Sequence, residues 1–246
     1  MSGQETVMIS QAILQGRLHG AAEQALMDSV YAGAMKLHNY FRSSASFRVR
    51  IALELKALRY EYIAVHLARG EHKTDAYAAL SADALVPLLD VGGERLSQSM
   101  AIIEYLDETH PAPALLPADA LGRAKVRALA QSIACEIHPV NNLRVLKYLV
   151  RELKVGEDAK NAWYRHWCRV GLEAFERQLS LLPPATYCYG HSPTLADCCL
   201  VPQIYNAQRF EVNLDGLPRT MAAFEACMAL PAFQKAHPSA CPDHEA

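Results

Sequence analysis

The sequence predicts a small α/β unit followed by an all-helical half. Between Met35 and about residue 110, short segments rich in β-branched and aromatic residues are interleaved with helical segments. Beyond a proline-rich stretch at residues 110–119, apolar residues recur only at helical spacing. The length of 246 residues also exceeds the usual size of one compact core, which favours two modest domains.

Residues 1–34 are expected to be an extension or an overlong start. They lack the basic start and apolar block of a secretory signal, and Glu5, Glu23 and Asp28 argue against a transit peptide. We therefore place the beginning of the first domain at Met35.

The first domain is expected to cover residues 35–115 and to begin with a strand, a helix and a second strand. Residues 36–41 and 60–67 are short and partly alternating, which is typical of strands, whereas residues 46–57 have a helical period. Because a short loop cannot join parallel strands, the intervening helix predicts a parallel βαβ crossover.

The same domain is expected to end with a strand, a turn and a helix. Residues 85–91 predict the strand, Gly92 and Gly93 the turn, and residues 97–110 a helix that stops before Pro111.

The second domain is expected to cover residues 122–246 and to be all helical, after a stiff linker that contains three prolines. One predicted helix carries an apolar stripe at helical spacing, formed by Trp163, Trp167, Val170, Ala174, Phe175 and Leu182. Thr194 followed by Asp197 is typical of a capping box, which has a role in folding rather than in chemistry.

Composition narrows the functional classes. With 24 basic and 26 acidic residues, the chain lacks the long-range field that gathers nucleic acid or anionic membranes. No apolar run approaches the ~20 residues of a membrane span. The seven cysteines lack paired C-x-x-C spacing, so we expect no metal site and reduced thiols in the cytoplasm. Cys198 and Cys199 lie in an apolar helical run, where cysteine usually acts as a small buried hydrophobic residue.

The loop after the first predicted strand is a candidate anion site. Arg42, Ser43 and Ser44 follow this strand at its carboxyl end, where α/β units bind ligands, and the next helix begins there. A helix start offers free N–H donors and partial positive charge, so a thiolate is one candidate ligand. A plain N-cap explains a single serine equally well.

A second polar pair, Gln98 and Ser99, opens the helix at 97–110 and either binds a carboxylate or caps the helix. Pro87 has no backbone N–H to donate to a neighbouring strand. The Val86–Pro87 bond therefore belongs at the edge of a sheet, at a bend or in a cis peptide.

These residues carry a resemblance to a known family. "FRSSASFRVRIAL", beginning at Phe41, resembles the signature of Zeta-class glutathione transferases, with Ala45 in place of a cysteine. The likeness continues in order through "LVP", "QSMAIIEYL", "PALLPAD", "IHPVNNLRVL", "TLADCCLVPQ", "RFEVNLD" and "AFQKAHP". It covers essentially everything after Met35, and the ordered set is highly specific.

The resemblance implies an N-terminal thioredoxin-like domain, a helical glutathione transferase C-terminal domain and a homodimer. It also implies glutathione as the cofactor and cis-trans isomerisation of maleylacetoacetate or maleylpyruvate to the fumaryl isomer, in the breakdown of aromatic compounds.

The resemblance also implies roles for particular residues. Ser43 would stabilise the glutathione thiolate, Val86 before a cis Pro87 would pair its backbone with the tripeptide, and Gln98 and Ser99 would hold the γ-glutamyl end.

For the dicarboxylate substrate, Arg42 and Arg209 would receive the carboxylates. His138 and Asn142 would share one helix face and point into the cofactor pocket. Without the resemblance, the plainer readings are favoured: Arg209 as a surface residue and His138 as a structural one.

Two positions depart from the family pattern. In this scheme the nucleophile belongs to glutathione, so Ala45 is expected to alter affinity or turnover without abolishing activity. Leu143 stands where some maleylpyruvate isomerases carry a second arginine, which weakens assignment to that substrate.

Two other functions stay open. A general glutathione transferase or peroxidase would use the same thiolate site with an apolar neighbouring pocket. A binding protein without activity would keep the core and lose glutathione affinity, and Ser43, Gln98 and Ser99 argue against it.

Overall fold

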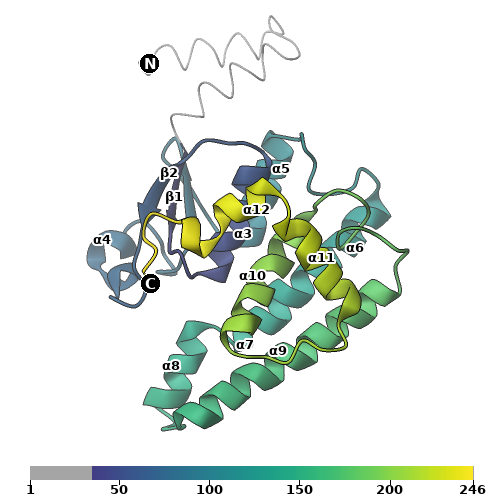
Figure 1. Cartoon of the computed structure of the whole chain (residues 1–246). Coiled ribbons are helices and arrows are strands. Elements are labelled where there is room, and N and C mark those ends of the chain that lie inside the picture. The colour runs from purple at the N-terminus through teal and green to yellow at the C-terminus, as the bar shows by residue number, and fades with distance from the viewer. Residues whose placement is uncertain (1–34, 246) are drawn as a thin grey trace, which may run out of the picture.

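The computed structural model describes residues 35–245 and confirms the predicted order of an α/β unit followed by helices (Figure 1). The expectation for residues 1–34 lies outside the described residues. In the described part of the chain, no helix is both long and apolar enough to cross a membrane.

A mixed four-stranded sheet forms the first part of the fold. The strands are β1 (Met35–Asn39), β2 (Glu61–Ala64), β3 (Leu88–Val91) and β4 (Glu94–Ser97), in the order β2-β1-β3-β4. β1 pairs with β2 in parallel, as predicted, and β3 is antiparallel to both β1 and β4.

The sequence analysis missed β4. Gly92 and Gly93 take positive φ values of 63° and 98°, which a turn between β3 and β4 uses at little cost. The strand itself, "ERLS", has one apolar residue, so the pairing with β3 and not its own pattern defines it.

Helices of the first part connect the strands. α3 (Ser44–Leu55) joins β1 to β2, η1 (Glu71–Lys73) and α4 (Asp75–Ala78) lie before β3, and α5 (Ser99–Thr109) follows β4.

The helical half follows the linker. Its elements are α6 (Ala120–Gln131), η2 (Ser132–Ile137), α7 (His138–Val140), α8 (Leu143–Arg151), α9 (Glu157–Ser180), α10 (Leu195–Arg209), α11 (Pro218–Met228), α12 (Pro231–Ala236) and η3 (Pro238–Ala240). The expected capping box of Thr194 and Asp197 is present at the start of α10. Cys198 and Cys199 are fully buried in α10, as predicted.

The expected apolar stripe of α9 is partly wrong. Trp167 and Val170 are 39% and 43% exposed, whereas Phe175 is buried. The face that enters the core is formed by Tyr164, Cys168, Leu172, Phe175 and Leu179. Both stripes have helical spacing, so spacing alone could not select between them.

The two halves share one hydrophobic core. A continuous cluster of buried side chains runs from Met35 and Leu37 in β1, through α3, to Ile204 in α10 and Phe233 in α12. The linker is fixed to the first part by Lys56, a buried residue whose Nζ donates to Asp107 and to the carbonyl groups of His110 and Pro113.

Candidate active site

The loop between β1 and α3 forms one wall of a cavity. Ser43 is the N-cap of α3, and its Oγ accepts a hydrogen bond of 3.2 Å from the backbone N–H of Ser46. The plain capping role is therefore real. It occupies an acceptor site of the oxygen and leaves the hydroxyl hydrogen free to donate to an anion in the cavity.

A second helix start faces the same cavity. Ser99 is the buried first residue of α5, and its Oγ accepts a hydrogen bond of 3.3 Å from Arg48 Nη1. Gln98 precedes it with φ 66°, a positive value that costs a non-glycine residue of order 1–3 kcal/mol. The Val86–Pro87 bond is cis, as predicted, and β3 pairing begins just after it, at Leu88.

His138 and Asn142 do meet, but not on one helix face. α7 ends at Val140, and Asn142 is the N-cap of α8. The Oδ1 atom of Asn142 accepts the backbone N–H of Arg144 at 3.1 Å, so its amide nitrogen donates to Nε2 of His138 at 3.2 Å. Nδ1 of His138 then carries the ring hydrogen and can act as a donor.

His138 is held in its neutral form. Burial, together with the positive charges of Arg48 and Arg144, lowers its pKa from 6.5 to about 3. A neutral imidazole is available at physiological pH as a hydrogen-bond donor and not as a charge.

Arg42 and Arg209 lie on the open side of the cavity. Both are exposed; Arg42 donates to the hydroxyl of Tyr40 from Nε at 3.2 Å and from Nη2 at 2.9 Å. Arg209, at the end of α10, donates to Oδ1 of Asn206 at 3.0 Å. Neither forms an ion pair with a carboxylate of residues 35–245, so both guanidinium groups retain donors and charge for a ligand.

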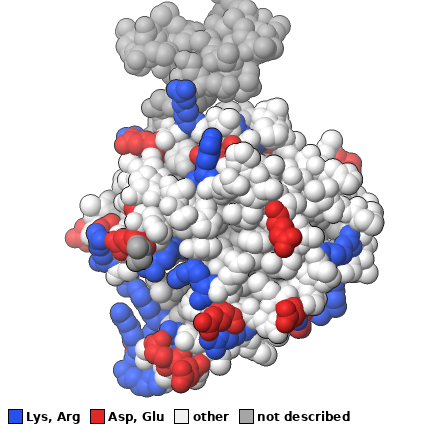
Figure 2. Space-filling model, viewed as in Figure 1, with Lys and Arg blue, Asp and Glu red and all other residues white. Residues whose placement is uncertain are grey.

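All nine residues that the sequence analysis selected line one cavity of about 780 Å³: Arg42, Ser43, Val86, Pro87, Gln98, Ser99, His138, Asn142 and Arg209. Ala45 and Leu143 line it as well. Seven lysine and arginine residues face it against two acidic ones, Asp83 and Glu152. Figure 2 shows basic side chains gathered over α8, beside a few acidic ones. In a chain of net charge −2, this local surplus favours an anionic ligand.

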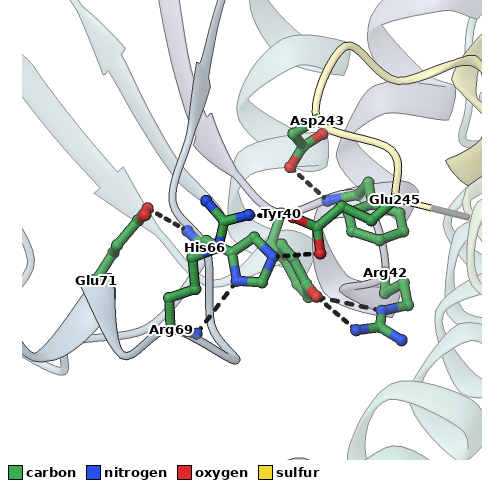
Figure 3. A network of polar contacts seen from close by, with 8 residues as sticks. Tyr40, Arg42, His66, Arg69, Glu71, Asp243 and Glu245 are labelled. Atoms are coloured by element: carbon green, nitrogen blue, oxygen red, sulfur yellow. Dashed lines mark hydrogen bonds and ion pairs between the residues drawn. The ribbon is translucent and has the colours of Figure 1, made fainter.

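The sequence analysis missed the C-terminal tail, residues 241–245, which returns to the loop after β1 (Figures 1 and 3). Oδ2 of Asp243 accepts the backbone N–H of Phe41 at 3.2 Å, and Oε2 of Glu245 lies 3.1 Å from Nε2 of His66. The His66 ring in turn packs edge-on against Tyr40, with ring centres 4.8 Å apart. The tail thus fixes the segment that carries Arg42 and Ser43.

The buried thiols are poor candidates for nucleophiles. Burial raises the pKa of Cys199 to about 11 and that of Cys198 well above its ordinary value. No cysteine of residues 35–245 is among the residues that line the cavity, so a thiolate bound there would belong to a ligand.

Comparisons with known proteins show the family of the chain. Residues 33–108 match the family model of the glutathione S-transferase N-terminal domain. A maleylpyruvate isomerase from Ralstonia sp. is 51% identical over 210 residues, which are 85% of this chain and 99% of the relative.

Solved structures give the same result. The holo structure of a bacterial maleylpyruvate isomerase, a Zeta-class glutathione S-transferase, is similar with a TM-score of 0.84 at 51% identity, over 85% of this chain and 100% of that one. A maleylacetoacetate isomerase from Anaeromyxobacter dehalogenans 2CP-1, with dicarboxyethyl glutathione and citrate bound in its active site, has a TM-score of 0.77 at 43% identity, over 86% of this chain and 98% of that one.

These similarities confirm the expected thioredoxin-like domain and helical glutathione transferase domain. The identity extends over nearly the whole length of the relatives and includes the part of the chain that forms the cavity. The chain belongs to the Zeta-class glutathione transferase family of maleylpyruvate and maleylacetoacetate isomerases.

Proposed function

We propose that this protein is a glutathione-dependent cis-trans isomerase that converts maleylpyruvate or maleylacetoacetate to the fumaryl isomer. The observation that carries the proposal is one cavity in which two serine-bearing helix starts and a surplus of cations converge. A thiol tripeptide with two carboxylates and a dicarboxylate substrate both suit that donor set.

The residues of the first part fit glutathione. Ser43 donates its free hydroxyl hydrogen, with the α3 start behind it, and so favours a thiolate over a thiol. Val86, next to the cis Pro87 and outside the β3 ladder, offers its backbone to an extended peptide. Gln98 and Ser99 offer the α5 start to the γ-glutamyl carboxylate.

When bound, glutathione supplies a nucleophilic thiolate whose reversible addition turns the double bond into a single bond about which rotation is fast. Arg42 and Arg209 bind the substrate carboxylates and stabilise the negative charge that develops in the transition state. His138 and Asn142 contribute neutral donors on the opposite wall.

Ala45 and Leu143 are compatible with this assignment. Because the nucleophilic thiolate belongs to glutathione in this proposal, the chain needs no cysteine at position 45. Leu143 removes one positive charge from the cavity, but Arg144 beside it also lines the cavity. The choice between the two substrates, the aromatic-degradation pathway, the homodimer and the cytoplasmic location stay predictions from the sequence.

The arginines provide the test. Replacing Arg42 and Arg209 together by methionine is expected to lower kcat/KM for maleylpyruvate or maleylacetoacetate at least about a hundredfold, since each charge-assisted contact contributes roughly 1.5–3 kcal/mol. Glutathione affinity, measured by calorimetry, should change little. Arg59→Met, at an exposed arginine that does not line the cavity, is the control.

A general transferase would give a different result. It would keep its activity toward an apolar electrophile, and the double variant would lose nothing on the dicarboxylates because neither would be a substrate.

A further inference from the structure

Arg48 is a buried arginine that the family comparison gives no role. It lies one turn into α3, is 2% exposed and lines the cavity. Its Nη1 donates to Ser99 Oγ at 3.3 Å, and Nε and Nη2 have no hydrogen-bond partner among residues 35–245. No carboxylate in that part of the chain is within ion-pair distance of it.

Arg50 shows that this is unusual within the same helix. It is 1% exposed, and all three guanidinium nitrogens are bonded: Nε to the carbonyl of Ala236 at 3.0 Å, Nη1 to Asn39 Oδ1 at 2.9 Å and Nη2 to the carbonyl of Phe41 at 3.0 Å. Arg50 therefore has a complete structural role. Arg48 does not.

A buried charge without a counter-charge is strongly disfavoured, so proteins rarely keep one that serves packing alone. Arg48 lines the cavity beside Ser99, and its positive charge helps to lower the pKa of His138 on the same lining. Its missing counter-charge therefore belongs on the cavity side.

Ser99 connects Arg48 to that side. Since Ser99 Oγ accepts from Arg48, its own hydrogen is free to donate to a ligand. The free N–H groups at the start of α5 add partial positive charge at the same point. Three donors or charges thus converge on one anion position.

We propose that Arg48 is a positioning residue for glutathione, which keeps Ser99 as a donor and supplies the buried positive charge opposite the γ-glutamyl carboxylate. This rests on the proposed function, because it presumes that glutathione binds in this cavity. Arg48 acts through Ser99 and through its field in a medium of low dielectric, where a single charge has a large effect.

The experiment is a double-mutant cycle on ligand and protein. Calorimetry compares glutathione with 4-aminobutyryl-cysteinyl-glycine, which is the same peptide without the γ-glutamyl carboxylate, and with the glycine amide of glutathione. The wild-type protein should prefer glutathione to the first analogue by at least about tenfold, the size of one charge-assisted contact. Arg48→Met should reduce that preference to less than about threefold and leave the preference over the glycine amide unchanged.

Three variants complete the design. Arg48→Lys keeps the charge and should recover most of the preference. Ser99→Ala should lower it without adding to the effect of Arg48→Met, because the two act on one contact. Arg59→Met, at an exposed arginine outside the cavity lining, should leave it unchanged.

The outcomes separate the two proposals. Equal preference in wild type and Arg48→Met, or a loss that falls on the glycine carboxylate instead, overturns the role of Arg48 and leaves the isomerase standing. Failure of the wild-type protein to bind glutathione overturns the proposed function itself. If Arg48→Met does not fold, Arg48→Lys and Ser99→Ala still decide: an unchanged preference in Ser99→Ala contradicts the proposal.

Discussion

Ser43 illustrates, at the scale of one residue, how a structural and a proposed chemical task share an atom. Its Oγ accepts the backbone N–H of Ser46 and caps α3, while its hydrogen is free for a thiolate. Two substitutions can separate these tasks, because glycine is a tolerable N-cap and alanine is not.

Ser43→Ala should lower the free energy of unfolding by about 1 kcal/mol and Ser43→Gly by only a few tenths. Both should reduce kcat/KM at least about a hundredfold, since both lose the hydroxyl donor. Chemical denaturation and isomerase assays measure the two effects. If the loss of activity in the two variants is proportional to their loss of stability, Ser43 acts only as an N-cap.

His138 predicts a pH dependence of stability. Its pKa is lowered from 6.5 to about 3 in the folded protein, so between these values the unfolded chain binds a proton that the folded chain does not. The stabilising contribution is therefore present above pH 6.5 and lost as the pH falls toward 3, with a slope of at most about 1.4 kcal/mol per pH unit.

Replacement by glutamine, which does not titrate, should flatten this acid limb in denaturation experiments between about pH 4 and 7. A difference between wild type and His138→Gln that is independent of pH would contradict the assignment.

At the scale of elements, the C-terminal tail connects chain ends that lie far apart in the sequence. Asp243 accepts the N–H of Phe41, and Glu245 contacts His66, next to the loop that carries Arg42 and Ser43 (Figure 3). Polar contacts of a tail that is partly exposed to solvent add little to global stability, so its main effect should be local.

Deletion of residues 242–246 should speed amide exchange at Phe41 and raise KM for glutathione several-fold, because a loosened loop misplaces Ser43. The melting temperature should change little. Asp243→Ala should reproduce most of the effect, and Asp215→Ala, at an exposed aspartate outside the cavity lining, should not. Unchanged exchange at Phe41 would show that the tail does not hold the loop.

The success of sequence reasoning also varied by element. β1, α3 and β2 could be predicted because alternation and helical period are local patterns. β4 could not, because pairing with β3 defines it. The "HPVNN" segment was read as one helix, whereas Asn142 begins a second one by capping it. Arg48 and the tail were missed because their contacts join residues 51 and 202 positions apart, which no local pattern encodes.

For the candidate site, Arg42, Ser43, Gln98 and Ser99 could be selected from their places at two predicted helix starts, whereas Arg209, His138 and Asn142 came from the family resemblance. The structure brings all nine selected residues into one cavity. Their individual roles stay predictions. The surplus of lysine and arginine around the cavity could not be predicted from composition, because acidic residues elsewhere in the chain balance it in the net charge.

At the scale of the whole molecule, a nearly neutral protein concentrates cations around a single cavity between an α/β unit and a helical half. That arrangement suits an anionic cofactor and an anionic substrate that bind together. Ala45, at the position of the family's cysteine, has no thiol that could replace the thiol of the cofactor. The central claim is therefore that isomerisation depends on glutathione.

The most direct test follows the loss of enol absorbance of maleylpyruvate and of maleylacetoacetate, each with and without glutathione, with a fumaryl-specific hydrolase to confirm the product. We predict turnover of at least one substrate, with glutathione present and not without it. Glutathione binding without turnover of either substrate, or equal turnover without glutathione, would contradict the account.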